Sequence, residues 1–494
     1  MAISTSDDSA SNAPVYKPGN IEDKLFINGQ FVLPSAGKKF DIYNPTTEEL
    51  AASVYEAGPE DVDRAVKAAS AAFPAWSALS SADRAGYLHK LADAIERNGQ
   101  ELSYLEAITM GKPSVHDFSI HLAAQFLRYF SGKAYDVAGD TSLHSPGFVN
   151  LTFRQPFGVC GAITPWNVPL LMLVFKVGPA LASGNTLILK SSEKSPLSSL
   201  VVGRLAQEIG LPEGVLNILS GGPVCGEAIA KHMEIRKVSF TGSLRAGRAI
   251  KKAAADSNMK NVTLELGGKS PLIVFDDADL DKAVHASAMS IMLNSGQSCV
   301  ASSRMYVHEA IAAQFTEKMK VAMVDLFPAA DPLLPGTGRG PQADKVQFNN
   351  VMSYLEYAKE NKLSIPLGGG RQGTTGYFVE PTIIANAPED SRVMREEIFG
   401  PVVCINTFTD ENDVLKLANN TEYGLYASVF TQDISRALRI AKSLEAGSIG
   451  VNCSSPGMQA DMPFGGWKQS GDGRELSRHC TDYWTELKSV FISL

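Results

Sequence analysis

Cysteines are few in this sequence, and none stands in a spacing that suggests a disulfide framework or a zinc site. Six occur among 494 residues, at positions 160, 225, 299, 404, 453 and 480, without a CxxC pair. Scattered thiols in a long chain indicate free cysteines in a reducing compartment. The eight histidines form no metal-like cluster, so we expect no catalytic metal.

Long apolar runs and an excess of basic residues are also missing. No run reaches the roughly 18 residues of a membrane span, and Lys176 and Pro179 interrupt the most apolar segment, 169–182. A formal net charge of −8 argues against nucleic-acid binding, which needs clustered lysine and arginine. Residues 1–20 carry no signal- or transit-peptide pattern. We therefore predict a flexible N-terminal tail and a cytoplasmic protein without nucleic-acid or membrane partners.

What is present is an ordinary globular composition in a chain too long for a single core, so we expect two or three domains. Asn28-Gly29 between two apolar runs predicts a hairpin over 25–32. Apolar residues at helical spacing then predict helices around 62–73 and 88–95. Alternating residues at 149–153 predict a strand outside the main core.

From Val159 onward, short apolar runs alternate with helical patterns. The predicted strands are 159–163, 187–189, 215–219, 238–240 and 262–266, and the predicted helices between them are 170–183, 196–208, 224–232 and 246–255. Such alternation predicts a parallel, doubly wound sheet. These sheets bind ligands at the carboxyl ends of their strands, where Thr164, Lys190 and Thr241 begin polar segments.

A second α/β alternation begins after Pro271. Its predicted strands are 272–275, 305–307 and 402–407, its predicted helix is 310–326, and a Pro- and Gly-rich loop follows at 327–340. No internal period relates this unit to the first. The chain ends with a Gly-rich turn at 463–468 and a predicted strand at 489–494.

Two reactive side chains stand in the stretch that joins these units. Cys299 follows Gly-Gln-Ser, and Glu265 precedes it by thirty-four residues. A thiolate is the nucleophile of cysteine chemistry, although a lone cysteine is more often a buried core residue. Gly242-Ser243, between a strand and a helix, could hold a phosphate or simply cap the helix. Glu193 could accept a ribose diol or be a solvated carboxylate.

Seven short motifs stand in a fixed order along the chain. They are Pro165-Trp-Asn167, Lys190-Ser-Ser-Glu193, Phe240-Thr-Gly-Ser243, Glu265-Leu-Gly-Gly-Lys269, Gly296-Gln-Ser-Cys299, Glu397-Ile-Phe399-Gly-Pro401 and Pro463-Phe-Gly-Gly466. In this order and spacing they resemble the NAD(P)-dependent aldehyde dehydrogenase family, and the resemblance runs from about residue 25 to the C-terminus. It implies an α/β fold with a doubly wound, Rossmann-like NAD-binding domain (21–135 and 155–267), a second α/β catalytic domain (268–468) and a small β oligomerisation domain (136–154 and 480–494).

The resemblance also implies roles for individual residues. Cys299 would be the nucleophile and Glu265 the general base, while the Asn167 amide and the Cys299 N–H would form an oxyanion hole; Lys176 joins the catalytic set. The implied cofactor-binding residues are Ile163, Thr164, Pro165, Trp166, Lys190, Glu193, Gly222, Phe240, Gly242, Ser243, Leu266, Glu397 and Phe399. The implied aldehyde tunnel comprises Val168, Leu171, Met172, Phe175, Leu293, Ser298, Val300 and Phe464.

These positions predict the cofactor and the kind of aldehyde. A carboxylate at Glu193 would repel the 2′-phosphate of NADP, so NAD is expected, although Lys190 could partly offset that repulsion. Every tunnel residue except Ser298 is apolar and none is cationic, which favours an uncharged aliphatic or aromatic aldehyde. Val168 and Phe175 stand where larger aromatic residues often occur, so the tunnel should be wide. The segment 453–462 could still bring in a polar group.

Other functions remain open at this level. A semialdehyde substrate, or a CoA-acylating relative in which CoA receives the acyl group, would need the same thiol, although the second has little need of Glu265. A non-catalytic binding protein could reuse the fold, but Cys299, Glu265 and Asn167 are all intact. The strands at 149–153 and 489–494 predict a homodimer or homotetramer, because unpaired edges invite pairing.

Overall fold

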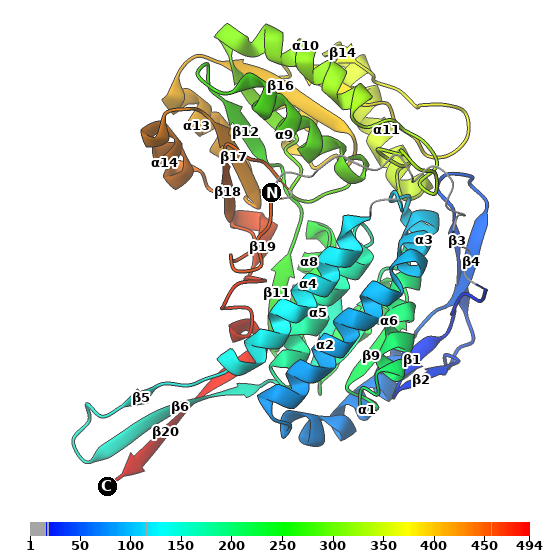
Figure 1. The fold of residues 1–494 in the computed structure, drawn as a ribbon, viewed down its shortest axis with the longest axis vertical. Helices are drawn as coiled ribbons and strands as arrows, with labels where there is room; N and C mark the ends of the chain where they lie inside the picture. The colour runs from blue at the N-terminus through cyan, green and yellow to red at the C-terminus, as the bar shows by residue number, and fades with distance from the viewer. Residues whose placement is uncertain (1–15, 17–18, 115–116, 456) are drawn as a thin grey trace.

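The computed structural model describes residues 16, 19–114, 117–455 and 457–494, and arranges them as two α/β units with a projecting β arm (Figure 1). The predicted N-terminal tail, 1–20, lies almost wholly outside the described residues. No helix in the described ranges combines the length and apolar character needed to cross a bilayer.

The first unit is built on an eight-stranded sheet. Its strands are β1 (Leu25–Ile27), β2 (Gln30–Val32), β7 (Val159–Ile163), β8 (Thr186–Ser191), β9 (Leu216–Ser220), β10 (Lys237–Thr241), β11 (Asn261–Glu265) and β19 (Gly471–Asp472), in the spatial order β19-β11-β10-β7-β8-β9-β1-β2. The strands from β7 to β11 are parallel, as predicted, and β1 joins β9 antiparallel. The predicted hairpin is also confirmed, with positive φ at Asn28 and Gly29.

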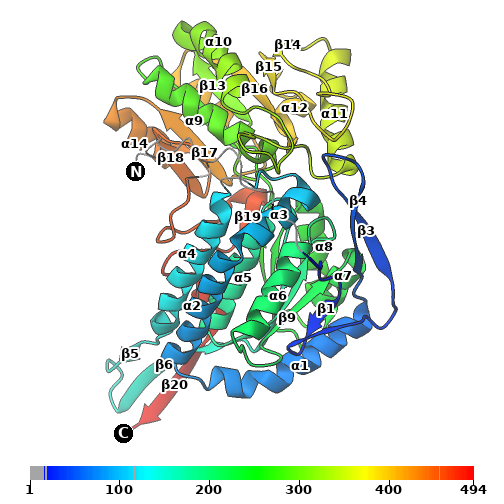
Figure 2. The same cartoon turned by 45° about the vertical axis from the view of Figure 1, so that its right-hand side comes forward.

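Helices cover both faces of this sheet (Figure 2). They are α1 (Pro59–Ser77), α2 (Ser81–Arg97), α3 (Gly99–Met110), α4 (Phe118–Lys133), α5 (Pro169–Ala182), α6 (Leu197–Glu208), α7 (Pro223–Lys231) and α8 (Leu244–Ala255), with a short 3-10 turn η1 (Ala134–Asp136). Helix α5 is buried along its whole length, packed on β8 beneath α2 and α4. A helix that is apolar all round is suited to that central position.

The second unit has a seven-stranded sheet. Its strands are β12 (Pro271–Val274), β13 (Arg304–His308), β14 (Ser364–Leu367), β15 (Thr382–Ala385), β16 (Val402–Phe408), β17 (Tyr426–Phe430) and β18 (Ser448–Val451), in the order β14-β15-β16-β13-β12-β17-β18. Only β14 is antiparallel to its neighbour. The helices are α9 (Leu280–Met292), α10 (Glu309–Asp325), α11 (Lys345–Glu360), α12 (Arg392–Arg395), α13 (Glu411–Asn419) and α14 (Ile434–Ser443), with 3-10 turns η2 (Leu293–Gly296) and η3 (Lys468–Ser470).

The arm is a three-stranded antiparallel sheet that projects from the lower end of the first unit (Figure 1). It consists of β5 (Thr141–Ser142), β6 (Phe148–Pro156) and β20 (Thr485–Ser493), in the order β20-β6-β5, and β20 follows the 3-10 turn η4 (Asp482–Trp484). The two predicted outlying strands therefore pair with each other over nine residue pairs. A separate hairpin, β3 (Lys39–Tyr43) with β4 (Leu50–Tyr55), runs beside both units.

Candidate active site

A cavity of about 540 Å³ is lined by residues of both α/β units. Many of the residues singled out in the sequence meet on its wall: Pro165, Trp166, Asn167, Val168, Leu171, Met172, Gly242, Ser243, Glu265, Leu266, Leu293, Ser298, Cys299, Val300, Glu397, Phe399 and Phe464. The first unit contributes the ends of its parallel strands, which is where such sheets bind ligands. The second unit contributes the thiol.

The thiol stands at the end of a strained turn. Asn294, Ser295 and Gly296 all have positive φ, at 52°, 56° and 74°. A Cβ at Gly296 would come within 2.0 Å of the Gly400 carbonyl oxygen, so only glycine fits there. Two successive non-glycine residues in this conformation are costly and persist only where the surroundings hold them.

Buried amides and a hydroxyl supply that support. The side-chain oxygen of Gln297 accepts the Ala343 backbone N–H at 2.8 Å, and the side-chain NH2 of Gln297 donates to the Asn294 backbone carbonyl at 3.1 Å. Ser295 donates to the Gly340 carbonyl at 2.5 Å, and Gln342 donates to the Ser295 carbonyl at 3.1 Å. The segment 340–343 thus fixes the turn that presents the thiol.

Asn167 lies against the same turn. Its side-chain amide donates to the Gln297 carbonyl at 3.0 Å, while Asn294 donates to the Asn167 carbonyl at 2.8 Å. These two bonds tie the loop after β7 to the backbone two residues before Cys299. A neutral donor is therefore held beside the nucleophile.

Cys299 itself is half-buried. The pKa of its thiol is raised to about 12. Burial is the largest cause, and the nearby Glu397 and Glu265 carboxyls contribute to the same rise. The thiol is therefore neutral near pH 7 in the free protein. Attack on a substrate needs a base to take the proton.

A group of buried carboxyls faces the thiol. Glu265 and Glu475 both line the cavity, and the Oε2 atom of each is buried without a hydrogen-bond partner in the described part of the chain. Burial, then the Glu475 charge, raises the pKa of Glu265 well above its ordinary value; Lys176 and Arg474 oppose this. Carboxyls perturbed in this way are candidates for proton transfer.

Lys176, from the middle of α5, does not line the cavity. Its ammonium group is fully buried and forms an ion pair with Glu475 Oε1. A second buried lysine, Lys237 on β10, donates to Asn261 at 2.9 Å and Thr263 at 3.0 Å. Burial lowers the pKa of Lys237 to about 7. Lys176 therefore acts from behind the cavity wall: it pairs with Glu475, and its charge lowers the pKa of Glu265.

Gly267 and Gly268 allow three functional groups to converge. A Cβ at position 267 would come within 2.0 Å of Glu397 Oε2, and one at 268 would come within 2.4 Å of the Cys299 carbonyl oxygen. The Gly268 N–H donates to Glu397 Oε1 at 3.0 Å, and burial raises the pKa of Glu397 to about 7. The two glycines in Glu-Leu-Gly-Gly are thus required by this close approach.

The remaining expected cofactor residues lie along the strand ends of the first sheet but do not line the cavity itself. They are Ile163, Thr164, Lys190, Glu193, Gly222 and Phe240. Ile163 ends β7 and Thr164 follows it, and Gly222 caps α7. Lys190 Nζ lies 3.7 Å from Glu193 Oε2, and the Glu193 side chain is 46% exposed. The carboxylate is therefore available to a ligand on this edge.

Aromatic and helix-terminal groups complete this side of the site. Ser243 caps α8, and its hydroxyl accepts the Ala246 N–H at 3.3 Å. Gly242 sits over the Phe240 ring, where a Cβ would come within 2.6 Å of a ring carbon. The Trp166 and Phe399 rings are 5.3 Å apart and nearly perpendicular. An exposed helix N-terminus with a glycine before it suits a phosphate group.

Phe175 is the one expected tunnel residue that is absent from the wall of the cavity. It lies one turn deeper along α5 than Leu171 and Met172, and α4 covers it there. Its ring packs against Phe126 at 4.9 Å and Phe130 at 6.4 Å. Phe175 is therefore core, and the width of the cavity depends on Val168 instead.

The fold also brings in residues that no motif indicated. They are Lys112, Pro113, Asp117, Phe118, Ser119, Leu122, Thr337, Gly338, Gln347, Asn350, Leu425, Met458 and Glu475. Lys112 adds a cation to the wall, which none of the expected tunnel residues supplies. Its ammonium group, however, pairs with Glu106 and with Asp117 at 3.0 Å, and donates to Ser119 at 2.6 Å. The cation is already neutralised within the wall.

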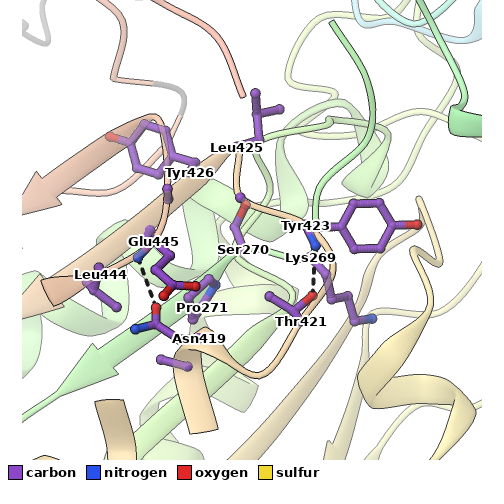
Figure 3. A pocket seen from close by; sticks show the side chains of 14 residues that line it. Lys269, Ser270, Pro271, Asn419, Thr421, Tyr423, Leu425, Tyr426, Leu444 and Glu445 are labelled. Carbon is purple, nitrogen blue, oxygen red and sulfur yellow. Dashed lines mark hydrogen bonds between the residues drawn. The ribbon is translucent and has the colours of Figure 1, made fainter. Parts of the chain in front are cut away.

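A second, much smaller hollow lies near the start of β12 (Figure 3). Its lining includes Ser270, Pro271, Tyr423 and Glu445, and its volume is about 10 Å³. That is room for about one water molecule. It is too small to be a second substrate site.

Comparisons with known proteins point in one direction. Residues 31–490 match the model of the aldehyde dehydrogenase family. The chain is 44% identical over 477 residues to human aldehyde dehydrogenase 1A1, covering 95% of each chain. It is 45% identical over 474 residues to an aldehyde dehydrogenase of Alternaria alternata, again covering 95% of each.

Solved structures agree with these sequence matches. The NAD+ complex of a Bacillus cereus aldehyde dehydrogenase superimposes with a TM-score of 0.93 at 42% identity, covering 96% of this chain and 97% of that one. A variant of the P. syringae indole-3-acetaldehyde dehydrogenase, in complex with NAD+ and IAA, has a TM-score of 0.94 at 39% identity, with coverage of 96% and 97%. The likeness extends over nearly the whole length of each protein.

Proposed function

The chain belongs to the aldehyde dehydrogenase family, and from this premise we propose that it oxidises an uncharged aldehyde to a carboxylic acid with NAD. The observation that carries the proposal is the convergence of Cys299, Asn167 and Glu265 on one cavity. A nucleophile, an oxyanion donor and a general base are the groups that a covalent route to an acid requires.

The first step uses the thiol and its neighbouring donors. A carboxylate of the cavity, Glu265 or Glu397, takes the Cys299 proton; Sγ then adds to the aldehyde carbon, and the carbonyl oxygen becomes the oxyanion of a thiohemiacetal. The Asn167 amide, held beside Gln297 by its hydrogen bond, and the Cys299 N–H can donate to that oxyanion. Loss of one such donor typically costs about 3 kcal/mol of transition-state stabilisation.

The strand-end residues fit NAD. The α8 N-terminus faces the cavity through Gly242 and Ser243, and the buried Glu397 carboxyl lies over Gly267. The half-exposed Glu193 can accept ribose hydroxyls and would repel a 2′-phosphate, which favours NAD over NADP. When bound, NAD would accept the hydride from the thiohemiacetal carbon. The acyl group is then left on Cys299 as a thioester.

Glu265 supports hydrolysis, rather than transfer to CoA, as the last step. Its buried Oε2 has no partner in the described chain and faces the cavity, so it can accept a proton from a water that attacks the thioester. Burial raises the pKa of this carboxyl, which makes its ionised form a stronger proton acceptor. An acyl transfer to a thiol would have less need of this base.

The wall near the thiol favours an uncharged aldehyde. Val168, Leu171, Met172, Leu293 and Met458 present hydrocarbon to the cavity. Lys112 is already paired with two carboxylates, so it offers no free charge to a semialdehyde carboxylate. Burying an unpaired charge costs several kcal/mol.

Turnover of an aldehyde panel, followed as NADH absorbance, tests the proposal. Hexanal and benzaldehyde should exceed succinic semialdehyde and betaine aldehyde in kcat/KM by at least about tenfold. NAD should exceed NADP with the best aldehyde. A charged aldehyde that is better by tenfold would contradict the substrate assignment, and CoA-dependent turnover would contradict the hydrolytic route.

We also propose that the arm makes the protein a homodimer or homotetramer. Among the described residues no strand pairs with the outer edge of β20, and Leu487, Phe491 and Leu494 are exposed there. An exposed apolar edge strand tends to pair with another strand. Light scattering should give a mass of two or four chains, and a variant lacking 489–494 should dissociate or aggregate. A monomeric intact chain at micromolar concentration would contradict this.

A further inference from the structure

Five serines form a hydrogen-bonded network behind the cavity wall. The serine network comprises Ser290 on α9, Ser302 before β13, Ser428 on β17, and Ser454 and Ser455 after β18. Ser290 and Ser302 are 2% and 0% exposed, and Ser455 is 3% exposed. Buried hydroxyls are costly unless they are paired, so their pairing is a specific feature of the packing.

One end of the network brackets the nucleophile. Ser290 Oγ lies 2.5 Å from Ser455 Oγ and accepts the Ser302 N–H at 2.9 Å. Helix α9 leads directly into the strained turn before Cys299, and Ser302 follows Cys299 by three residues. The backbone on both sides of the thiol is thus joined to Ser290.

The other end of the network holds the loop after β18. Ser454 Oγ lies 3.1 Å from Ser302 Oγ and 3.3 Å from Ser428 Oγ. Just before it, Asn452 has a positive φ of 52°, and its side chain bonds both the N–H and the carbonyl of Thr431, at 3.0 and 2.9 Å. The loop therefore begins from a fixed point.

Met458, at the far end of this loop, lines the cavity, whereas Ser454 and Ser455 do not. The two hydroxyls point instead toward the network behind the wall. At Met458 the segment 453–462 thus presents an apolar side chain to the cavity, and not the polar group that it could have supplied to the substrate. Its polar atoms connect that wall to the nucleophile.

We propose that the Ser290–Ser455 hydroxyl pair positions Met458 relative to Cys299 and thereby sets the discrimination between long and short aldehydes. An aldehyde held at the thiol reaches Met458 only if its chain is long enough. Loosening the loop should weaken binding of long aldehydes and leave short ones unchanged. Both serines are positioning residues, since neither touches the cavity.

Ser455→Ala, Ser290→Ala and the double variant test this inference, which rests on the proposed aldehyde oxidation. Each single change should raise KM for hexanal by about fivefold to tenfold, with kcat for hexanal and both constants for propanal within twofold of wild type. The range follows from the worth of one or two buried methylenes. The double variant should be no worse than Ser290→Ala, because that change already breaks the pair and also removes the acceptor of the Ser302 N–H.

Ser287→Ala is a matched control. Ser287 lies on α9 one turn before Ser290, is fully buried, and has no hydrogen-bond partner in the described chain. Its removal deletes a buried hydroxyl of the same helix without touching the network. Equal effects of Ser287→Ala and Ser290→Ala, or equal losses for propanal and hexanal, would overturn the inference.

A second measurement does not depend on aldehyde oxidation. Alkylation of Cys299 by iodoacetamide and by a bulky aryl iodoacetamide can be followed by peptide mass spectrometry, which separates it from the exposed Cys453. Ser455→Ala should change the ratio of the two rates at Cys299 at least threefold, and Ser287→Ala should not. An unchanged ratio would overturn the inference even if the protein proved not to oxidise aldehydes, and a changed ratio would support it in either case.

Discussion

The cavity has two walls that treat buried polar groups in opposite ways. On the carboxyl wall, Glu265, Glu397 and Glu475 lie close together, and Glu265 and Glu475 each leave one buried oxygen without a partner in the described chain. On the hydrocarbon wall, Val168, Leu171, Met172, Leu293 and Met458 face the cavity, and the hydroxyls of the serine network behind this wall are paired.

The difference separates chemistry from recognition. Unpaired buried carboxyls destabilise the fold, and such costs are tolerated where the groups react. Paired hydroxyls behind an apolar surface cost little and define a shape. The carboxyl wall should therefore control rate and its dependence on pH, while the hydrocarbon wall should control which aldehyde is used.

The largest expected effect comes from the thiol between the walls. Cys299→Ala removes the group that forms the covalent intermediate, so turnover should fall by roughly a thousandfold or more. The thermal midpoint should change little, since the side chain is half-buried. NADH absorbance and differential scanning fluorimetry measure the two effects. Turnover within tenfold of wild type would show that another residue is the nucleophile.

Glu265→Gln tests the carboxyl wall. Loss of a positioned base should lower steady-state turnover by roughly a hundredfold or more, while acylation continues. A pre-steady-state burst of NADH should therefore persist. If the burst disappears together with turnover, Glu265 acts mainly in activating the thiol, and the two steps share one base.

Val168→Phe tests the hydrocarbon wall. A ring at this position would fill space beside Leu171 and Met172, so kcat/KM for benzaldehyde should fall by roughly tenfold while that for propanal stays within twofold. Steady-state kinetics with the two aldehydes give the answer. An equal loss with both would mean that Val168 supports Asn167 rather than bounding the substrate.

The smallest effect is a displacement of the pH profile. Glu475 raises the pKa of Glu265, and its partner Lys176 lowers it. Glu475→Gln removes the carboxylate that raises this pKa and leaves Lys176 without its ion-pair partner, so the pKa of Glu265 should fall. The acid limb of the kcat profile should therefore move to lower pH. A limb that moves to higher pH would contradict this electrostatic effect of Glu475 on Glu265.

Most of the first sheet could be predicted from the sequence, because its strands are short apolar runs separated by helical patterns. Helices α3 and α4 were not predicted. Residues 102–110 of α3 are almost all buried, so the apolar periodicity that marks a half-exposed helix is weak there. The pairing of β6 with β20 joins segments more than 300 residues apart and has no local signal.

The residues of the site also fall into two groups, those that the sequence indicates and those that only the fold brings in. Motifs indicated residues that lie against the segment carrying the thiol, such as Gly268 and Asn167, which follow the ends of β11 and β7. Lys112, Met458 and Glu475 come from loops and helices that only the tertiary fold brings together. Phe175 shows the limit of a family resemblance: the resemblance implied that it lines the tunnel with Leu171, but α4 covers that turn of α5.

Lys237 and Glu397 have a consequence for handling the protein. Glu397 has a folded-state pKa near 7, above its ordinary value, so its cost to the free energy of unfolding develops as pH rises from about 4.5 to 7 and then stays constant. Lys237 also titrates near 7 in the fold, below its ordinary value, so its cost is complete below pH 7 and disappears as pH rises toward 10.5. Near neutral pH, Glu397 and Lys237 therefore both lower the free energy of unfolding by their full amounts. For these two groups, a mildly alkaline storage buffer should give a higher thermal midpoint than a neutral one.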